Sequence, residues 1–270
     1  GRHEQDSYPE LRMLNEKLFL SPTLALAETD QSASIMGTLA RENYMRSMMQ
    51  LFSYDYERAE LIHASEDRLD NFTDRADSFL VGLSEHVESY EESQQINMLM
   101  QTIANFERIG DCASNIEELA QRAKQEKLTF SPSARYELKT ISEAVDEITE
   151  MTLDAFTHKD QNASRKIEPL EEVIDEMVLL LKDRHIERLK NGVCTISAGL
   201  IFLETLTNLE HIGDKCSNIA VLLESQHNGE IMRSHHNFLK ELHKGGDTEY
   251  MSEFNRQHDN YIKPILNMQD

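Results

Sequence analysis

Apolar residues recur at helical spacing along most of the chain from Ile35 onward, in long stretches rich in Leu, Ala, Glu and Met. The pattern predicts six long helices, in two groups of three, and favours helix over sheet throughout. The expected helices span residues 35–53, 55–90, 93–127, 134–157, 160–191 and 193–225. We therefore predict an all-α fold, made of two tandem three-helix bundles that form an elongated helical domain.

Breaks in this pattern divide the chain into four parts. Residues 1–34 read as a linker with a short helix, because Ser21-Pro22-Thr23 interrupts a polar stretch. Repeat 1 spans residues 35–130 and repeat 2 spans 131–228, with Ser and Pro at the junction. Residues 229–270 form a C-terminal tail with a last helix from about Thr248 to Ile262.

Two segments show that the three-helix unit is duplicated. Residues 105–116 (NFERIGDCASNI) and 208–219 (NLEHIGDKCSNI) are identical at eight of twelve positions. They lie 103 residues apart, which is the size of one three-helix unit. Similarity at one fixed separation is the signature of an internal repeat.

Charge and cysteine content narrow the range of functions. The chain has 27 basic and 49 acidic residues, a formal charge of −22, which opposes binding to nucleic acid or to an anionic membrane. Cations are the expected partners. Three cysteines without a CxxC motif suggest neither a disulfide framework nor a thiolate zinc site. The most apolar stretch, residues 196–209, contains Glu204 and is too short to span a membrane.

Four pairs of acids, two per repeat, stand out by their context. Spacing alone carries little weight, since about nine acid-x-x-x-acid pairs are expected by chance at this acid content. These four pairs, however, occupy matching places in the two repeats and share a helix face with apolar and small residues. A spacing of four places two side chains within about 40° on one face. The eight residues are Glu66, Asp70, Glu107, Asp111, Glu171, Asp175, Glu210 and Asp214.

Carboxylates held against apolar neighbours lose hydration, at a cost of several kcal/mol each, unless a cation compensates them. We therefore predict carboxylate sites for divalent or trivalent metal ions, with iron, Mn, Mg, Ca and Zn as candidates. Gly110 and Gly213 indicate a close neighbour, either an ion or a packed helix. Asp74 and Asp77 are expected to add ligands in repeat 1 only. Four asparagines are expected to orient the ligands: Asn105, Asn115, Asn208 and Asn218.

Two other interpretations of these acids remain open. They could line a water-filled groove or meet basic residues of another helix. A carboxylate-bridged metal enzyme of the ferritin type would need Glu-x-x-His pairs. Glu60/His63 and Glu224/His227 match that spacing, but they occupy non-equivalent places in the repeats, and we interpret them as surface residues.

With these motifs the chain resembles the PhoU family of phosphate-uptake regulators, over about residues 35–224. The likeness rests on the two three-helix repeats, the acid pairs and the Glu-Arg-Ile-Gly-Asp-like strings followed by Asn-Ile. Residues 184–220 and 18–26 also resemble the cytoplasmic C-terminal region of bacterial sodium/phosphate cotransporters. The resemblance implies metal clusters at the same eight carboxylates. One departure is His211, where the family string usually has Arg.

The resemblance implies a non-enzymatic, metal-binding regulatory domain of a sodium-dependent phosphate transporter. Its expected partner is the membrane transport domain of the same polypeptide, on the cytoplasmic side of the cell membrane. The start Gly1-Arg2-His3, without Met, is read as that of a fragment. A homo-oligomer is a further expected partner, and nucleic acid is not. The alternative is a free-standing PhoU-type regulator that acts in trans on a transporter or a sensor kinase.

Overall fold

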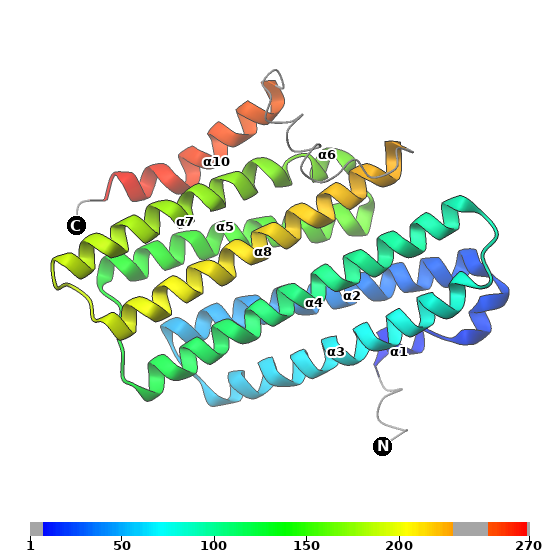
Figure 1. Cartoon of the computed structure of the whole chain (residues 1–270), viewed down its shortest axis with the longest axis horizontal. Coiled ribbons are helices and arrows are strands. Elements are labelled where there is room, and N and C mark those ends of the chain that lie inside the picture. The colour runs from blue at the N-terminus through cyan, green and yellow to red at the C-terminus, as the bar shows by residue number, and fades with distance from the viewer. Residues whose placement is uncertain (1–7, 229–247, 269–270) are drawn as a thin grey trace.

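The fold is all-α, as predicted, and elongated (Figure 1). The computed structural model describes residues 8–228 and 248–268, and these contain no strand. The helices are α1 (Pro9–Arg12), the 3-10 helix η2 (Glu16–Leu20), α2 (Pro22–Phe52), α3 (Tyr56–Ser84), α4 (Tyr90–Gln125), α5 (Pro132–His158), α6 (Gln161–Ser164), α7 (Ile167–Lys190), α8 (Ile196–Asn228) and α10 (Thr248–Leu266).

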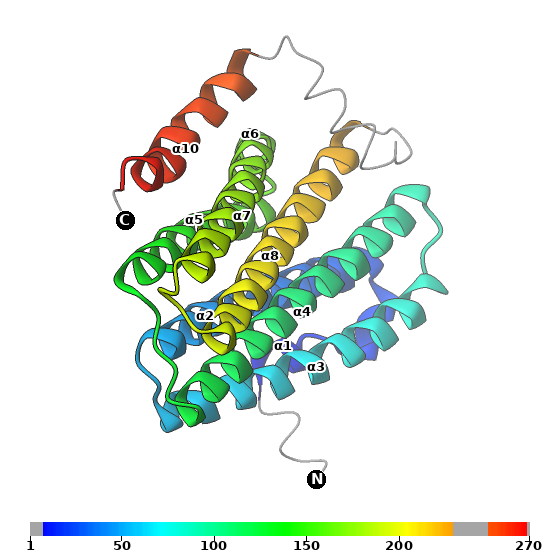
Figure 2. The same ribbon diagram turned by 60° about the vertical axis from the view of Figure 1, so that its left-hand side comes forward.

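The six long helices form two bundles of three. Helices α2, α3 and α4 pack on one another, as do α5, α7 and α8. Contacts of α4 with α8 and of α2 with α5 join the bundles, so α4 and α8 run side by side through the middle of the molecule (Figure 2). A continuous core of buried apolar side chains extends through both bundles. None of the described helices is long and apolar enough to cross a membrane.

Side-chain caps fix where the long helices begin. The Asp55 carboxylate accepts a hydrogen bond from the Arg58 backbone N–H at 3.0 Å, which confirms the expected cap of α3. Ser89 caps α4 in the same way, through the Glu92 N–H, so α4 starts at Tyr90 rather than at the expected Ser93. Ser131 caps α5 at the junction between the repeats.

The first long helix is longer than the sequence pattern suggested, since it begins at Pro22 instead of Ile35. Proline is favoured at the first helical position, because its missing N–H would be unpaired there anyway. Polar residues concealed this first part of the helix. Thr29 and Ser32 are buried, with hydroxyls that donate to backbone carbonyls four residues earlier at 2.8 and 2.9 Å.

The helix expected over residues 160–191 is divided into α6 and α7. The cause is Pro169, whose ring would clash with the carbonyl of the residue four positions earlier in a continuous helix. Because α7 restarts at Ile167, Pro169 falls in its first turn, where it is tolerated. The helix that carries Glu171 therefore starts only one turn before this residue.

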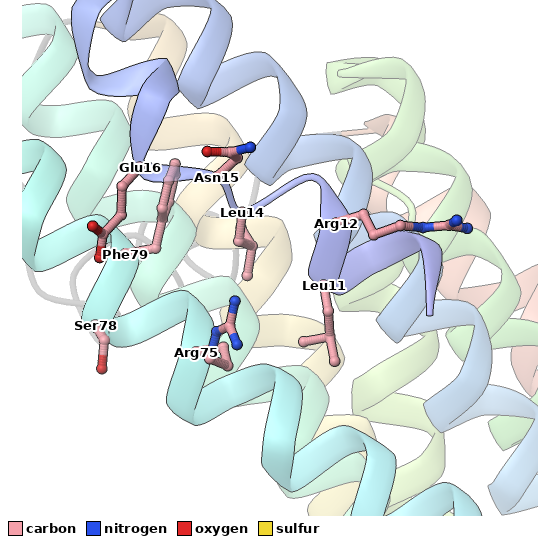
Figure 3. Close-up of a pocket in the computed structure, with 8 residues that line it drawn as sticks. All are labelled: Leu11, Arg12, Leu14, Asn15, Glu16, Arg75, Ser78 and Phe79. Atoms are coloured by element: carbon pink, nitrogen blue, oxygen red, sulfur yellow. The ribbon is translucent and has the colours of Figure 1, made fainter. Parts of the chain in front are cut away.

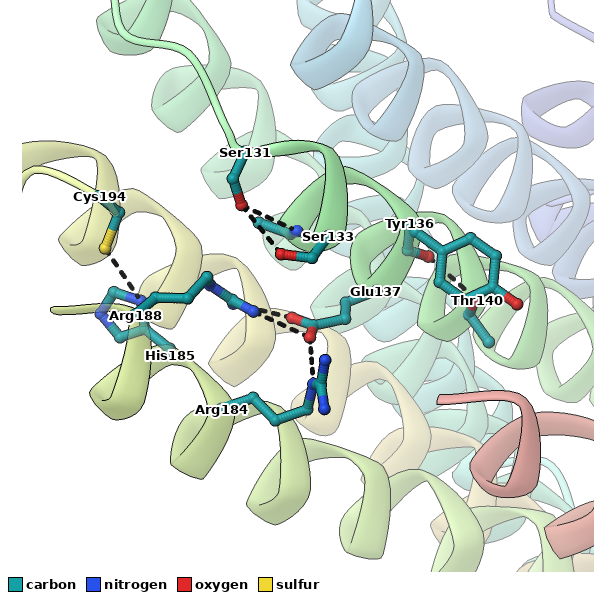
Figure 4. Close-up of polar contacts among 10 residues, drawn as sticks. Ser131, Ser133, Tyr136, Glu137, Thr140, Arg184, His185, Arg188 and Cys194 are labelled. Carbon is teal, nitrogen blue, oxygen red and sulfur yellow. Dashed lines mark hydrogen bonds and ion pairs between the residues drawn. The ribbon is translucent and has the colours of Figure 1, made fainter. Parts of the chain in front are cut away.

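Two buried glutamates connect helices through arginine. Arg184 and Arg188 of α7 donate to the Glu137 carboxylate of α5 at 2.5 to 2.9 Å, and Figure 4 shows both guanidinium groups converging on it. Arg68 of α3 donates to both oxygens of Glu10 in α1, at 2.5 and 2.8 Å. These charge-assisted pairs fix α7 on α5 and the N-terminal segment on α3.

The predicted C-terminal helix is confirmed from Thr248 and continues to Leu266, whereas residues 229–247 of the predicted tail lie outside the described residues. Helix α10 lies along α7 and also touches α5 (Figure 1). Ile262 and Ile265 are buried, and Gln257 donates to the Glu147 carboxylate of α5 at 2.8 Å, beside a hydrogen bond from the Tyr261 hydroxyl. The helix is thus an integral layer of the second bundle.

A cavity of about 640 Å³ lies between the N-terminal segment and α3 (Figure 3). Leu11, Leu14 and Phe79 contribute apolar side chains to its wall, and Arg75 contributes a guanidinium group. None of the eight predicted metal ligands lines it.

The two Glu-x-x-His matches behave differently. Glu60 and His63 are exposed, as interpreted. Glu224, by contrast, is buried and accepts a hydrogen bond from the Ser164 hydroxyl at 2.6 Å, so its interpretation as a surface residue was wrong. A buried side chain in α8 meets the end of α6, a contact that the sequence spacing does not reveal. The side chain of His227 lies outside the described residues.

Two glycines offer a matched test of this packing. A Cβ on Gly37 would come within 2.9 Å of Leu153 and Phe106 atoms on two neighbouring helices, whereas a Cβ on Gly213 would meet only ordinary contacts beyond 3.6 Å. We expect Gly37→Ala to lower the free energy of unfolding by about 1–3 kcal/mol. Gly213→Ala should leave it unchanged or raise it by up to about 1 kcal/mol, because alanine favours helix. Urea denaturation of both variants measures this, and equal effects would contradict the packing described.

Candidate metal centres

In repeat 2 the structure brings three of the predicted ligands together. Glu171 and Asp175 lie one turn apart on α7, and Asp214 faces them from α8. One carboxylate oxygen from each lies within 4.8 Å of the others. Leu170 and Ile174, which neighbour these acids on α7, are apolar and buried, so the acids are held at the edge of a packed interface. The helical spacing of the motif thus creates the cluster.

Burial and mutual repulsion disfavour the ionised forms of these acids. Burial, with the charges of Glu168, Asp175 and Asp214, raises the pKa of Glu171 far above its usual range. Burial, with the charges of Asp214 and Glu210, raises the pKa of Asp175 to about 7. One Asp175 oxygen, Oδ1, is buried without a hydrogen-bond partner. These are the properties of a site that lacks positive charge.

Two further acids extend this cluster and were missed from the sequence. Glu168 and Glu172 approach Glu171 with oxygens within 4.8 Å. Ser217 of α8 donates to Glu168 at 2.6 Å. The criterion of duplication concealed Glu168, because its equivalent in repeat 1 is His63. A search for acids one turn from a predicted ligand, without the requirement for a repeat, would have found it.

Glu210 lies at the border of the cluster. Its carboxylate is 3.9 Å from the Lys182 ammonium group and adds to the charge that Asp175 experiences. The equivalent of Lys182 in repeat 1 is Asp77, so the two repeats differ in charge at this place.

In repeat 1 the predicted acids also share one region, but they are more exposed. The pKa of Glu107 is raised by burial and by Asp111, Asp70, Asp77 and Asp74, in that order. The pKa values of Asp70 and Asp111 are raised as well, chiefly by burial. Asp70 and Asp111 are nevertheless exposed, so the expectation that the carboxylates are held against apolar neighbours was wrong for these two. They lie at the outer rim of the α3–α4 contact.

Glu66 lies one turn before Asp70 on α3, and its Oε2 is 3.9 Å from His63 Nδ1. Gly110 is explained by helix packing, since a Cβ there would come within 2.7 Å of Leu69 on α3. A close ion is not needed to account for this glycine. Asp74 and Asp77 do lie near the predicted ligands, as their influence on Glu107 shows.

The four asparagines join the two repeats. Asn115 donates to Asn208 at 3.1 Å, and Asn218 donates to Asn105 at 3.2 Å, across the α4–α8 contact. The two bonds are equivalent, because residues 105 and 115 correspond to 208 and 218. Their role in orienting metal ligands stays a prediction, whereas their hydrogen bonds hold α4 antiparallel to α8.

Comparison with known proteins shows the family of this chain. The PhoU domain matches residues 33–120 and again residues 138–223. These two matches cover more than half of the sequence. The chain belongs to the PhoU domain family. Both matched segments coincide with the two three-helix repeats and contain all eight predicted ligands.

Two curated PhoU proteins are similar in sequence. The phosphate-specific transport system accessory protein PhoU homolog 1 of Thermotoga maritima is 25% identical over 143 residues, which are 53% of this chain and 60% of that protein. The Synechocystis PhoU homolog is 24% identical over 200 residues, 73% of this chain and 86% of that protein. The match thus spans less than two thirds of the Thermotoga protein.

Solved PhoU structures share the fold. PhoU from Pseudomonas aeruginosa aligns with a TM-score of 0.71 at 22% identity, over 76% of this chain and 99% of that one. PhoU from Streptococcus pneumoniae gives 0.70 at 21% identity, over 79% and 100%. The whole PhoU fold is therefore present here, and between a fifth and a quarter of this chain lies outside it.

The comparisons correct the predicted partner. These relatives are PhoU accessory proteins of a transport system, not transport domains that carry a PhoU-like tail. The prediction of a membrane transport domain in the same polypeptide was wrong. The narrower likeness to sodium/phosphate cotransporters has no support among these relatives either.

The raised pKa values predict how the metal-free protein responds to pH. An acid whose pKa is higher in the folded state keeps its proton there after the unfolded chain has lost it, so stability falls as pH rises between the two values. For Asp175 this window runs from about 4 to about 7. Between pH 5 and 7, in EDTA, we expect the free energy of unfolding to fall by roughly 1–3 kcal/mol, allowing for solvent screening.

Urea denaturation at several pH values measures the slope. Asp175→Asn cannot ionise and should give a shallower slope than the unmodified chain. Identical slopes for the two proteins would contradict a cluster in which burial and neighbouring acids raise the pKa of Asp175.

Proposed function

We propose that this chain is a PhoU-type regulator of phosphate uptake that acts in trans on a phosphate transporter or on its sensor kinase. Membership of the PhoU family carries the proposal. The names of the similar proteins, accessory proteins of a phosphate-specific transport system, supply the pathway. Such a regulator would meet its transporter at the cytoplasmic side of the membrane.

We further propose that metal ions bind at the two carboxylate clusters. The fit is best in repeat 2, where Glu171, Asp175 and Asp214 offer oxygens within 4.8 Å and an Asp175 oxygen is buried without a hydrogen bond. The donor set is all oxygen, which suits hard cations such as Mg²⁺, Mn²⁺, Ca²⁺ or iron, and Zn²⁺ also accepts carboxylates. Glu210 would complete this set, once released from Lys182.

In repeat 1 the proposed ligands are Asp70, Glu107 and Asp111, with Glu66 beside them. Their more exposed position and the added charges of Asp74 and Asp77 favour a more open site with more bound water. Because the two clusters differ in burial and in neighbouring charge, we expect them to differ in affinity.

The proposed role of the metal is electrostatic and structural. A bound cation supplies positive charge between the helices, and the carboxylates of α7 and α8 hold it. Ionised acids no longer repel one another, so α7 stays fixed against α8, as α3 does against α4. The regulator would then present a defined surface to its partner. This role needs no turnover, and the relatives named as accessory proteins favour it over a carboxylate-bridged metal enzyme.

Metal analysis tests the ligands. After dialysis against Mn²⁺ or Fe²⁺ and removal of free metal, we expect bound metal per chain to fall sharply in an Asp111→Asn/Asp214→Asn variant. Each substitution removes one negative charge from a cluster but preserves its shape. Glu118 and Asp154 are exposed acids outside both clusters, so a Glu118→Gln/Asp154→Asn variant is the matched control. Equal metal content in the two variants would refute the ligand assignment.

Uptake of labelled phosphate tests the regulatory role. In a bacterial strain that lacks its own PhoU protein, expression of the chain should restore control of uptake when phosphate is plentiful. The Asp111→Asn/Asp214→Asn variant should restore it less well, at equal protein level. Uptake that is unaffected by the unmodified chain would contradict the proposed function, and equal restoration by the variant would separate regulation from metal binding.

A further inference from the structure

Glu117 of α4 is a buried acid that the eight-carboxylate scheme does not include. Its side chain has no exposure to solvent. One oxygen, Oε1, accepts a hydrogen bond from the Tyr54 hydroxyl at 2.8 Å. The other oxygen, Oε2, is buried and has no hydrogen-bond partner. A buried carboxylate with an unsatisfied oxygen is costly unless positive charge lies against it.

Among the described residues, the one ion-pair contact of Glu117 is with His63 of α3. His63 Nε2 lies 3.6 Å from the unsatisfied Oε2. This separation is too long for a hydrogen bond. The His63 side chain is 54% exposed, so solvent reaches the space between the two groups. No lysine or arginine takes this place in the described part of the chain, in contrast to Glu10 and Glu137.

The second nitrogen of the same ring also faces a carboxylate. His63 Nδ1 lies 3.9 Å from Glu66 Oε2. Histidines that bind metal commonly donate the N–H of their other nitrogen to a carboxylate, which fixes the orientation of the ring. Glu66, His63 and Glu117 form a row in which the imidazole lies between two carboxylates, each beyond hydrogen-bond distance, and Tyr54 donates to the far oxygen of Glu117.

We propose that His63 Nε2 and Glu117 Oε2 bind a divalent transition-metal ion, with Glu66 as the residue that orients the imidazole. Two ligand atoms, each about 2.1 Å from a tetrahedral ion, lie about 3.4 Å apart, close to the 3.6 Å observed. Water fills the remaining positions on the exposed side. A mixed nitrogen and oxygen donor set selects Zn²⁺, Co²⁺ or Fe²⁺ over Ca²⁺ and Mg²⁺.

This site is confined to repeat 1. The residues equivalent to His63 and Glu117 in repeat 2 are Glu168 and Ala220. In repeat 2 an acid therefore replaces the imidazole, and an alanine replaces the buried acid. The proposal shares Glu66 with the predicted centre of repeat 1, but it does not rest on metal binding by the other carboxylates. It makes the two halves of the chain chemically distinct.

Visible absorption of Co²⁺ tests this site. Chelator-treated protein is titrated with Co²⁺, and the absorption of the bound ion gives its number and coordination. We expect His63→Ala to lose one equivalent with a nitrogen-containing donor set, and Glu117→Gln to weaken that equivalent at least tenfold. His158 is an exposed histidine of α5 that belongs to none of the proposed sites, so His158→Ala is the matched control and should bind as the unmodified chain does.

The Asp111→Asn/Asp214→Asn background separates this site from the two proposed centres. In that background the equivalent that depends on His63 should persist, even if the other ions are lost. An unchanged Co²⁺ spectrum and stoichiometry in His63→Ala would overturn the proposal, whatever the fate of the other clusters. Because His63 is exposed, its replacement is expected to leave the fold intact, and circular dichroism checks this for both variants.

Discussion

The desolvation of carboxylates is the constraint on which the arrangement of this bundle depends. The chain has 49 acids and 27 bases, its packed helices bury several of the acids, and each buried acid needs a counterpart. Glu137 and Glu10 accept hydrogen bonds from arginines, and each of these contacts fixes one helix on another. Glu224 accepts a hydrogen bond from the Ser164 hydroxyl of α6. Glu171, Asp175 and Asp214 instead lie against one another and against further acids, which is why cations are expected there.

Much of this architecture can be read from the sequence, because it follows from periodicity and repetition. The all-α fold, the three-plus-three organisation and the cap at Asp55 depend on local spacing. The grouping of Glu171, Asp175 and Asp214 could be predicted for the same reason: acids four residues apart share a helix face, and the repeat shows which helices pair. The family resemblance pointed to the same residues.

The remaining features depend on contacts between segments far apart in the sequence. The exposure of Asp70 and Asp111 follows from their place at the rim of α3 and α4, which helix spacing alone does not define. The buried Glu224 requires knowledge of where α6 ends. Glu168 and Glu117 could not be predicted from the repeat, because the residues at these positions differ between the two halves. The proposed chemistry of these two acids therefore depends on positions where the two halves differ, not on positions that they share.

The paired asparagines between α4 and α8 have a consequence for the origin of the chain. Asn105 meets Asn218, and Asn115 meets Asn208, so each half offers the other the same surface. A contact of this kind is what an isologous two-fold interface between identical subunits produces. The chain therefore has the pseudo-two-fold arrangement of a symmetric homodimer within a single polypeptide. The two halves share this interface and still differ at other positions, as Glu117 and its equivalent Ala220 show.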